Sequence, residues 1–108
     1  MTAVSAISHQ IWDMKYRLKS AAGDVIDGTV DDTWRRVAAA LAAPEDADMR
    51  EVWAEKFEAA LTDFRFLPAG RIIAGAGTDR DVTLFNCFVM GTIPDDMSGI
   101  FEQLREAA

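Results

Sequence analysis

The chain has 108 residues, of which half are hydrophobic and 27% are charged, and its formal net charge is -7. This composition is typical of a small globular protein and argues against a disordered tail. The acidic surplus disfavours a nucleic-acid polymer as a partner, because a polyanion is repelled by the overall field, whereas a single nucleotide is not excluded.

A membrane-spanning or secreted protein is also disfavoured. No apolar run approaches the roughly 20 residues that cross a bilayer. The N-terminus lacks the basic flank and apolar core of a signal peptide, and the single cysteine, Cys87, cannot form an internal disulfide. We therefore expect a cytoplasmic protein without membrane contact. His9 is the only histidine and has no second ligand nearby in the sequence, so we expect no metal site.

The first expected element is a helix that begins at Ser5 or Ser8 and ends at about Ala22. Its apolar residues recur at helical spacing: Ile7, Ile11, Met14 and Leu18. The turn-forming residues between Gly23 and Gly28 end it.

A second helix is expected from Thr29, whose hydroxyl caps the free amides, with Asp32 in a capping-box position. Pro44 cannot continue this helix and marks its end. One face carries its apolar side chains: Trp34, Val37, Ala38 and Leu41.

A third helix is expected after Asp46 or Asp48, either of which can cap it. An aromatic stripe at helical spacing indicates a core-facing side. The residues of that stripe are Trp53, Phe57, Ala60, Leu61 and Phe64.

The sequence pattern changes after residue 66, from helical spacing of apolar residues to an apolar run that contains glycines. Gly70, Gly75 and Gly77 interrupt an apolar run, which predicts a glycine-rich loop instead of a helix. Residues 83–90 are β-branched and aromatic without clean alternation, which predicts a strand buried on both faces. We therefore divide the chain into a helical region, 1–66, and a second region, 67–108.

A last helix is expected after Asp95 or Asp96, with its apolar residues at core-facing spacing: Met97, Ile100, Phe101 and Leu104. No glycine, proline or polar tail follows it before Ala108. A strand without neighbours and a helix without a closing signal lead us to expect part of a larger fold.

Cys87 has two interpretations from the residues alone. It is either a buried structural thiol, the usual fate of a lone cysteine, or the reactive end of a site behind the glycine-rich loop.

A series of short motifs in a specific order resembles the N-terminal part of the catalytic subunit of class II ribonucleotide reductases, the adenosylcobalamin (vitamin B12) dependent enzymes. The motifs are Ile11-Trp12, Lys15-Tyr16-Arg17, Asp27-Gly28, Thr33-Trp34, Arg36-Val37-Ala38, Phe66-Leu67-Pro68-Ala69-Gly70-Arg71, Gly75-Ala76-Gly77-Thr78, Asn86-Cys87-Phe88-Val89-Met90, Ile93-Pro94-Asp95 and Ile100-Phe101. Short motifs recur by chance, and it is their order and spacing that carry the resemblance.

The resemblance implies a mainly α N-terminal region joined to the first strand of a larger α/β, ten-stranded barrel, so that this chain is a fragment of an α/β enzyme. The implied activity is the reduction of ribonucleoside diphosphates or triphosphates by thiyl-radical chemistry. The implied cofactor is adenosylcobalamin, bound mainly by downstream residues, and the fragment alone is expected to be inactive. The implied partners are the ribonucleotide, the remainder of the polypeptide, and an external dithiol reductant such as thioredoxin or glutaredoxin.

The resemblance also implies site residues. Cys87 matches the first member of the pair of cysteines that reduces the substrate, and its partner and the radical cysteine are not in this chain. Asn86 stands next to the substrate phosphate, or else bonds backbone at a strand irregularity. Gly77 and Thr78 match the loop that meets the phosphate, with a plain turn as the alternative. Many reductases carry Pro-Thr where Arg71-Ile72 stands here, so Arg71 is either a phosphate ligand or the partner of a carboxylate elsewhere in the enzyme.

The alternative function is a free-standing helical protein-interaction module with a structural cysteine. In that case Trp34, Trp53, Phe57 and Phe64 form a complete core, and the Cys87 segment docks on a partner. A small thiol-dependent oxidoreductase ranks last, because a resolving cysteine is missing.

Overall fold

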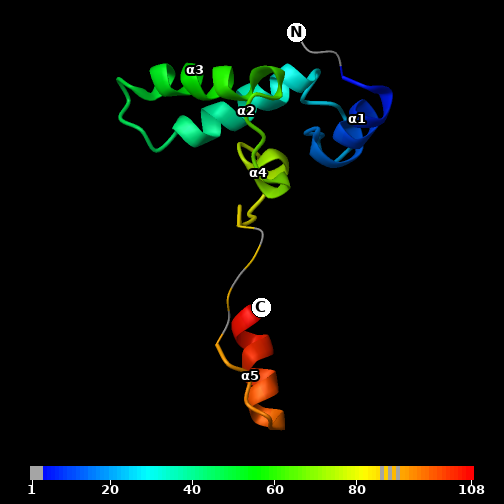
Figure 1. Ribbon diagram of the computed structural model, residues 1–108, viewed down its shortest axis with the longest axis vertical. Coiled ribbons are helices and arrows are strands. Elements are labelled where there is room, and N and C mark those ends of the chain that lie inside the picture. Colours follow the sequence, from blue (N-terminus) through cyan, green and yellow to red (C-terminus); the bar gives the residue numbers. More distant parts are fainter. Residues whose placement is uncertain (1–3, 86, 88, 90) are drawn as a thin grey trace.

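The computed structural model describes residues 4–85, 87, 89 and 91–108, and the described part is helical (Figure 1). It measures 56 × 38 × 29 Å. The elements in chain order are α1 (Ala6–Ile11), a π-helical turn η1 (Trp12–Tyr16), α2 (Val30–Ala42), α3 (Arg50–Leu61), a 3-10 turn η2 (Thr62–Phe64), α4 (Gly70–Gly75) and α5 (Met97–Ala107).

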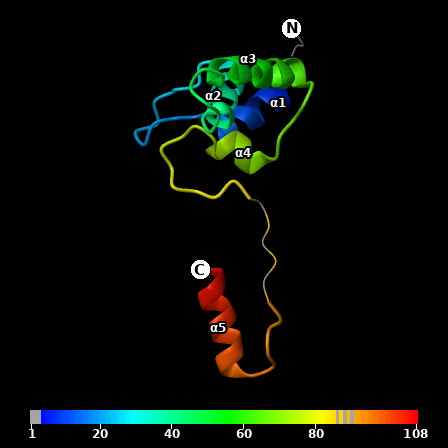
Figure 2. The same cartoon turned by 90° about the vertical axis from the view of Figure 1, so that its left-hand side faces the viewer.

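The body of the protein is a pair of helices, α2 and α3, which lie side by side, with α4 against α2 (Figure 1). Its buried core joins these three helices through Trp34, Val37, Ala38, Leu61, Ile73 and Ala76. Both views show α5 apart from this body, at the end of an extended connection (Figure 2). None of the described helices is long and apolar enough to cross a membrane.

The first helix begins where the sequence predicts and ends earlier. The Ser5 hydroxyl accepts a hydrogen bond from the Ser8 amide at 3.3 Å and caps α1. The prediction that the helix reaches Ala22 is wrong, since helical structure stops at Tyr16. The reason is a tertiary contact: the Asp27 carboxylate accepts a hydrogen bond from the Leu18 amide at 3.1 Å and folds the chain back.

The N-terminus of α2 is confirmed as predicted. The Thr29 hydroxyl accepts from the Asp32 amide at 3.2 Å, and the Asp32 carboxylate accepts from the Thr29 amide at 3.0 Å. One apolar residue was assigned to the wrong face, because Leu41 is 39% exposed whereas Ala42 is fully buried. The packed face advances by four residues a turn, through Trp34 and Ala38 to Ala42, and so turns away from position 41.

This capping box predicts a pH dependence. The Thr29 amide, followed by Arg35, holds the pKa of Asp32 below its usual value. Because the pKa is lower in the folded protein than in the unfolded chain, the ionised carboxylate stabilises the fold at pH values above the pKa of the unfolded chain. This contribution is lost as the pH falls through the pKa that the group has in the folded protein. We expect Asp32→Asn to have a lower urea midpoint than the parent at pH 7, and the difference to shrink as the pH falls below 3.8, the ordinary pKa of the carboxyl group. A difference that stays constant or grows on acidification below that pH would contradict the assignment.

The cap predicted for α3 is wrong. Residue Met49 precedes the helix without a side-chain hydrogen bond, so neither Asp46 nor Asp48 caps it. The aromatic stripe is only partly a core: Leu61 is buried, and Trp53 and Phe57 are half-buried. The stripe's other members, Ala60 and Phe64, are exposed, because α3 packs mainly on α2 among the described elements.

The region after residue 66 differs from the prediction in two ways. Gly70–Gly75 is the short helix α4 and not a loop. Its glycines occupy the two ends, where they begin and finish a helix without interrupting it. The described residues among 83–90 form no strand, because no neighbouring strand exists in the described part for them to pair with. They are exposed, not buried on both faces. The ten-stranded barrel and the domain boundary at residue 66 stay predictions.

The last helix is confirmed, with Asp96 as its cap, since the Gly99 amide donates to Asp96 Oδ1 at 2.7 Å. Its apolar face has no covering element in the described part of the chain. The side chains of that face are between 42% and 72% exposed: Met97, Ile100, Phe101 and Leu104.

Candidate functional site

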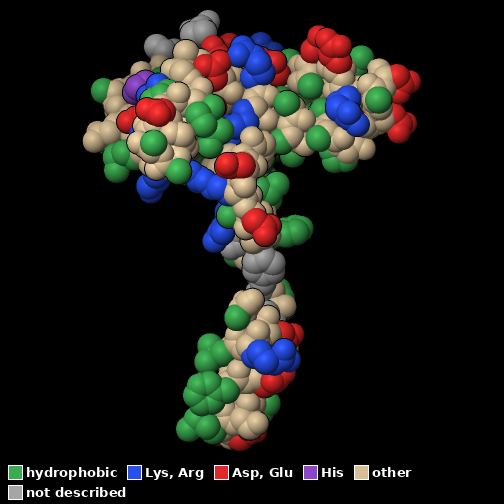
Figure 3. All heavy atoms as spheres, turned by 180° about the vertical axis from the view of Figure 1, so that it is seen from behind, with side chains coloured by type: hydrophobic (Ala, Val, Ile, Leu, Met, Phe, Trp, Pro, Cys, Tyr) green, Lys and Arg blue, Asp and Glu red, His purple; other side chains and the backbone are tan. Residues whose placement is uncertain are grey.

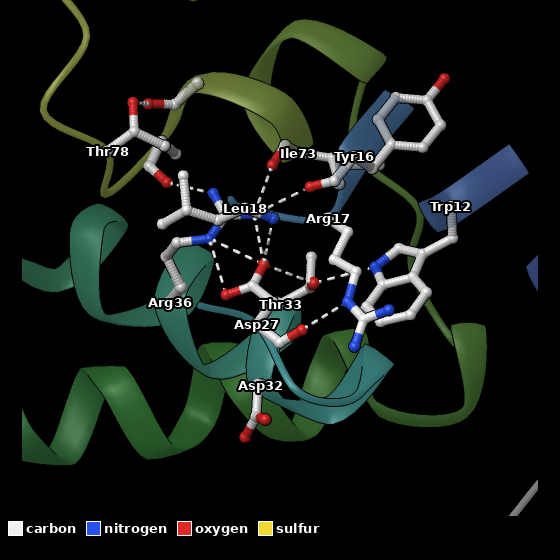
Figure 4. Close-up of polar contacts among 12 residues, drawn as sticks. Trp12, Tyr16, Arg17, Leu18, Asp27, Asp32, Thr33, Arg36, Ile73 and Thr78 are labelled. Atoms are coloured by element: carbon white, nitrogen blue, oxygen red, sulfur yellow. Dashed lines mark hydrogen bonds and ion pairs between the residues drawn. The ribbon is translucent and has the colours of Figure 1, made fainter. Parts of the chain in front are cut away.

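A buried polar cluster lies at the junction of the N-terminal segment, α2 and α4 (Figure 4). Its centre is an ion pair between Asp27 and Arg36, whose side chains are only 4% and 8% exposed. Arg36 Nη2 lies 3.0 Å from Asp27 Oδ2, and Arg36 Nε lies 3.2 Å from the same oxygen. A charge buried this deeply needs a partner, and each of these two residues supplies it for the other.

The carboxylate of Asp27 is further satisfied by neutral donors. The Thr33 hydroxyl donates to Oδ2 at 2.7 Å and itself accepts from the Trp12 indole nitrogen at 2.9 Å. The Leu18 amide donates to the same carboxylate oxygen. These bonds attach the N-terminal segment to α2.

The guanidinium of Arg36 continues across to α4. It donates to the carbonyl oxygens of Ile73 at 2.9 Å, Ala76 at 2.6 Å and Tyr16 at 3.2 Å (Figure 4). The first two carbonyls lie at the end of a helix, where no intrahelical partner satisfies them. Arg36 therefore fixes the turn that follows α4.

That turn carries two of the predicted substrate-binding residues, Gly77 and Thr78. Gly77 has a φ of +74°, and a Cβ there would lie 2.9 Å from the backbone oxygen of Arg36. Both the dihedral and the contact restrict this position to glycine. The Thr78 hydroxyl donates to the Gly75 carbonyl at 2.8 Å and accepts from the Arg80 amide at 3.3 Å. In this structure the hydroxyl therefore stabilises the turn.

The remaining predicted site residues are spread over a longer distance along the chain. Arg71 is exposed on α4, and its side chain makes no hydrogen bond or ion pair within the described residues. Cys87 is exposed, so burial in this chain does not account for it. Asn86 lies outside the described residues. The structure thus brings Gly77 and Thr78 together, with Arg71 on the helix before them, while Cys87 lies further along the chain, between α4 and α5.

Sequence reasoning missed the two residues that hold the turn, Asp27 and Arg36. Both stand in motifs that carry the family resemblance, yet no role was assigned to them. The signal was available in α2: Arg36 lies between the apolar residues Trp34 and Val37, on the edge of the face that packs. A charged residue at such a position predicts a buried partner.

Three of the cavities that the described residues form lie near this cluster. One, of about 350 Å³, is lined by Trp12, Trp34, Phe64 and Ile73 among others. A second, of about 340 Å³, includes Arg71 and Arg80, and a third, of about 490 Å³, includes Lys19, Gly77 and Thr78. No group of three or more potential metal ligands occurs within the part of the chain that the structure describes.

Comparison with known proteins gives two findings. Residues 3–81 match the family described as "Ribonucleotide reductase, all-alpha domain". Two curated proteins named vitamin B12-dependent ribonucleoside-diphosphate reductase, from Mycobacterium tuberculosis strains CDC 1551 / Oshkosh and ATCC 25618 / H37Rv, are each 35% identical to the chain over 96 residues. The similarity covers 89% of this chain and 13% of each relative, so the chain spans a small part of their length. No solved structure matches it.

Proposed function

The chain belongs to the ribonucleotide reductase family through its all-alpha domain, and from this we propose that it is the N-terminal part of a vitamin B12-dependent enzyme that reduces ribonucleotides to deoxyribonucleotides. The observation that carries the proposal is the 35% identity to B12-dependent reductases over 96 residues. This similarity is longer than the match to the helical family, which covers residues 3–81. The direct test is to express the full-length protein that contains this segment and measure B12-dependent deoxyribonucleotide formation.

Cys87 is proposed as one of the two thiols that supply the electrons. In that step the two thiols become a disulfide, the substrate loses its 2'-hydroxyl as water, and the external dithiol later reduces the disulfide. The exposure of Cys87 in this chain supports the proposal, because a thiol that is to meet a substrate and a second cysteine must be accessible.

The turn at Gly77 and Thr78 is proposed to present backbone amides to the substrate phosphate. Its support is the rigidity of the turn: Arg36 holds the Ala76 carbonyl from one side, and Thr78 bonds back to Gly75. A binding turn held by buried partners loses little conformational freedom when it meets a ligand. Asn86 and Arg71 complete the proposed substrate-side residues, and Asn86 rests on the family resemblance alone.

The described residues do not fit the cofactor. Each of the three cavities is smaller than a corrin ring with its nucleotide arm, and the single histidine, His9, is exposed and stacks edge-on to Trp12. We therefore assign the adenosylcobalamin site to the rest of the polypeptide and derive no step of the reaction from it here.

This assignment predicts that the 108-residue chain binds adenosylcobalamin weakly or not at all. A titration followed by the corrin absorption bands should show no saturation in the micromolar range. The full-length protein is the positive control under the same conditions. Micromolar affinity of residues 1–108 would overturn the assignment.

The exposed apolar face of α5 and the exposed segment around Cys87 are proposed to pack against the remainder of the polypeptide. Their support is the amount of apolar surface involved, since side chains such as Phe85 and Phe101 are 71% and 60% exposed. Single exposed apolar residues are ordinary, whereas a continuous series of them indicates a contact surface. We propose a cytoplasmic location and a thioredoxin- or glutaredoxin-type reductant on the family resemblance.

A further inference from the structure

The connection between α3 and α4, residues 62–67, is a strap that is fixed at both ends and exposed in its middle (Figure 2). Leu61, just before it, is 3% exposed, and Pro68, just after it, is buried. The apolar side chains between these two anchors are 42%, 61% and 62% exposed: Phe64, Phe66 and Leu67. Exposed hydrophobic side chains also gather on one side of α5, away from the body (Figure 3). The strap is thus an apolar surface segment within the body itself.

Two consecutive residues of the strap have a left-handed backbone, which disfavours any residue with a side chain. The dihedral φ is +57° at Asp63 and +58° at Phe64, and the other residues with positive φ in the described part of the chain are glycines. A left-handed conformation brings Cβ close to the following carbonyl oxygen and reduces the population of that conformation roughly 5- to 30-fold per residue. Aspartate tolerates the conformation through local hydrogen bonds, whereas phenylalanine has no such group. The strap is therefore strained.

An aromatic contact opposes this strain. The Phe64 ring lies edge-on to the ring of Trp34, with 5.7 Å between the ring centroids and an angle of 89° between the planes. Trp34 is 4% exposed and belongs to the core, so it offers a fixed surface. Such a ring pair favours the contact by about 2- to 12-fold beyond the burial of area, and burial of about half of the Phe64 side chain adds about 4- to 12-fold. The contact and the strain are of the same order, which is the condition for two populated states.

Phe64 is also part of a cavity wall. Its side chain lines the apolar cavity of about 350 Å³, together with Trp12 from the N-terminal segment, Trp34 from α2 and Ile73 from α4. Phe66, the next aromatic residue of the strap, does not line it. Departure of the Phe64 ring from Trp34 therefore opens this cavity to solvent, whereas movement of the Phe66 ring does not.

We propose that the strap is a gate of the apolar cavity. In its closed state the Phe64 ring packs on Trp34 and the backbone of Asp63 and Phe64 is left-handed. In its open state these two residues leave the left-handed region, the strain is released, and the ring moves out of the cavity wall. The buried anchors at Leu61 and Pro68 confine the movement to the residues between them. The gate is a property of this chain and does not depend on the reaction proposed for the full-length enzyme.

The first test compares two glycine substitutions in the strap of the 108-residue chain. The chain carries 5-fluorotryptophan, and the ¹⁹F resonance of Trp34, assigned with Trp34→Phe, reports the ratio of closed to open gate. Asp63→Gly removes strain from the closed state and should raise this ratio about threefold or more. Arg65→Gly is the matched control, because Arg65 has an ordinary φ of −63° and a glycine there only adds freedom to the open state. It should lower the ratio about two- to fivefold. Changes in the same direction, or an unchanged ratio in Asp63→Gly, would overturn the proposal.

The second test measures access to the cavity by acrylamide quenching of tryptophan fluorescence. Phe64→Ala removes the gating ring and should increase quenching above that of the parent. Phe66→Ala is the matched control, since it removes the same ring from the same strap at a position that is 61% exposed and does not line the cavity. Asp63→Gly keeps every ring and should decrease quenching below the parent, because it depopulates the open state. Equal quenching in the parent and Asp63→Gly, or equal increases in the two alanine variants, would overturn the proposal.

Discussion

Replacing Arg36 by methionine is expected to lower the free energy of unfolding by about 3–5 kcal/mol, the usual cost of leaving a buried charge without its partner. The charge left behind is Asp27, which is 3% exposed. The substitution also removes the donors to the carbonyls of Ile73 and Ala76. Methionine keeps much of the aliphatic stem, so loss of charge and hydrogen bonds dominates over loss of packing. Urea unfolding followed by tryptophan fluorescence measures the difference.

A neighbouring arginine provides the control for this experiment. Arg35 lies next to Arg36 in α2 and pairs with Asp32 and Glu58, but its side chain is 61% exposed. Arg35→Met should therefore cost less than about 1 kcal/mol. In the double variant Asp27→Asn with Arg36→Met, the loss should be smaller than the sum of the single losses, because the two residues interact directly. Equal losses for Arg35→Met and Arg36→Met would contradict the structural role of the cluster.

Replacing Cys87 by serine in the full-length enzyme is expected to reduce deoxyribonucleotide formation to background. A hydroxyl cannot form the disulfide that leaves the two electrons with the substrate. In the 108-residue chain the fold should be unaffected, because Cys87 is exposed there and surface substitutions change stability by within about 0.5 kcal/mol. Product is measured after a single turnover without external reductant, where the parent enzyme should form product and a new disulfide together.

The 108-residue chain supplies the control for folding. Its Cys87→Ser variant should unfold at the same urea concentration as the parent. If the full-length variant retained turnover at a rate comparable with the parent enzyme, Cys87 would not be a reducing thiol. The match of the surrounding motif to the family would then not indicate a catalytic role for this residue.

The parts of the fold that the sequence predicts well are those with local causes. The caps at Thr29 and Asp96 bond amides three residues away, so the signal and the structure lie within one helical turn. The end of the first helix has a distant cause, since Asp27 reaches back nine residues to the Leu18 amide. Periodicity could not reveal this contact, and it predicted a helix that continued to Ala22.

In the candidate site, too, features with local causes were predicted and features with distant causes were not. The pattern of glycines placed Gly77 in a loop, and the residue does lie outside the helices, with a positive φ. The close approach of Arg36, which makes glycine necessary there, joins residues far apart in the chain and is invisible in the sequence. The glycines of α4 were predicted to interrupt a helix, whereas they lie at its two ends. Glycine is common in both situations, so the residue type alone does not distinguish them. The roles of Cys87 and Asn86 stay predictions of the family resemblance.

The Arg36 cluster also bears on the order in which the chain assembles. Its guanidinium joins the carbonyl of Tyr16, twenty residues earlier, to that of Ala76, forty residues later. Such contacts close long loops at a cost in conformational entropy, so we expect them to form after the local helices. We therefore expect the cluster to affect the unfolding rate, by slowing the separation of α2 and α4, more than the folding rate.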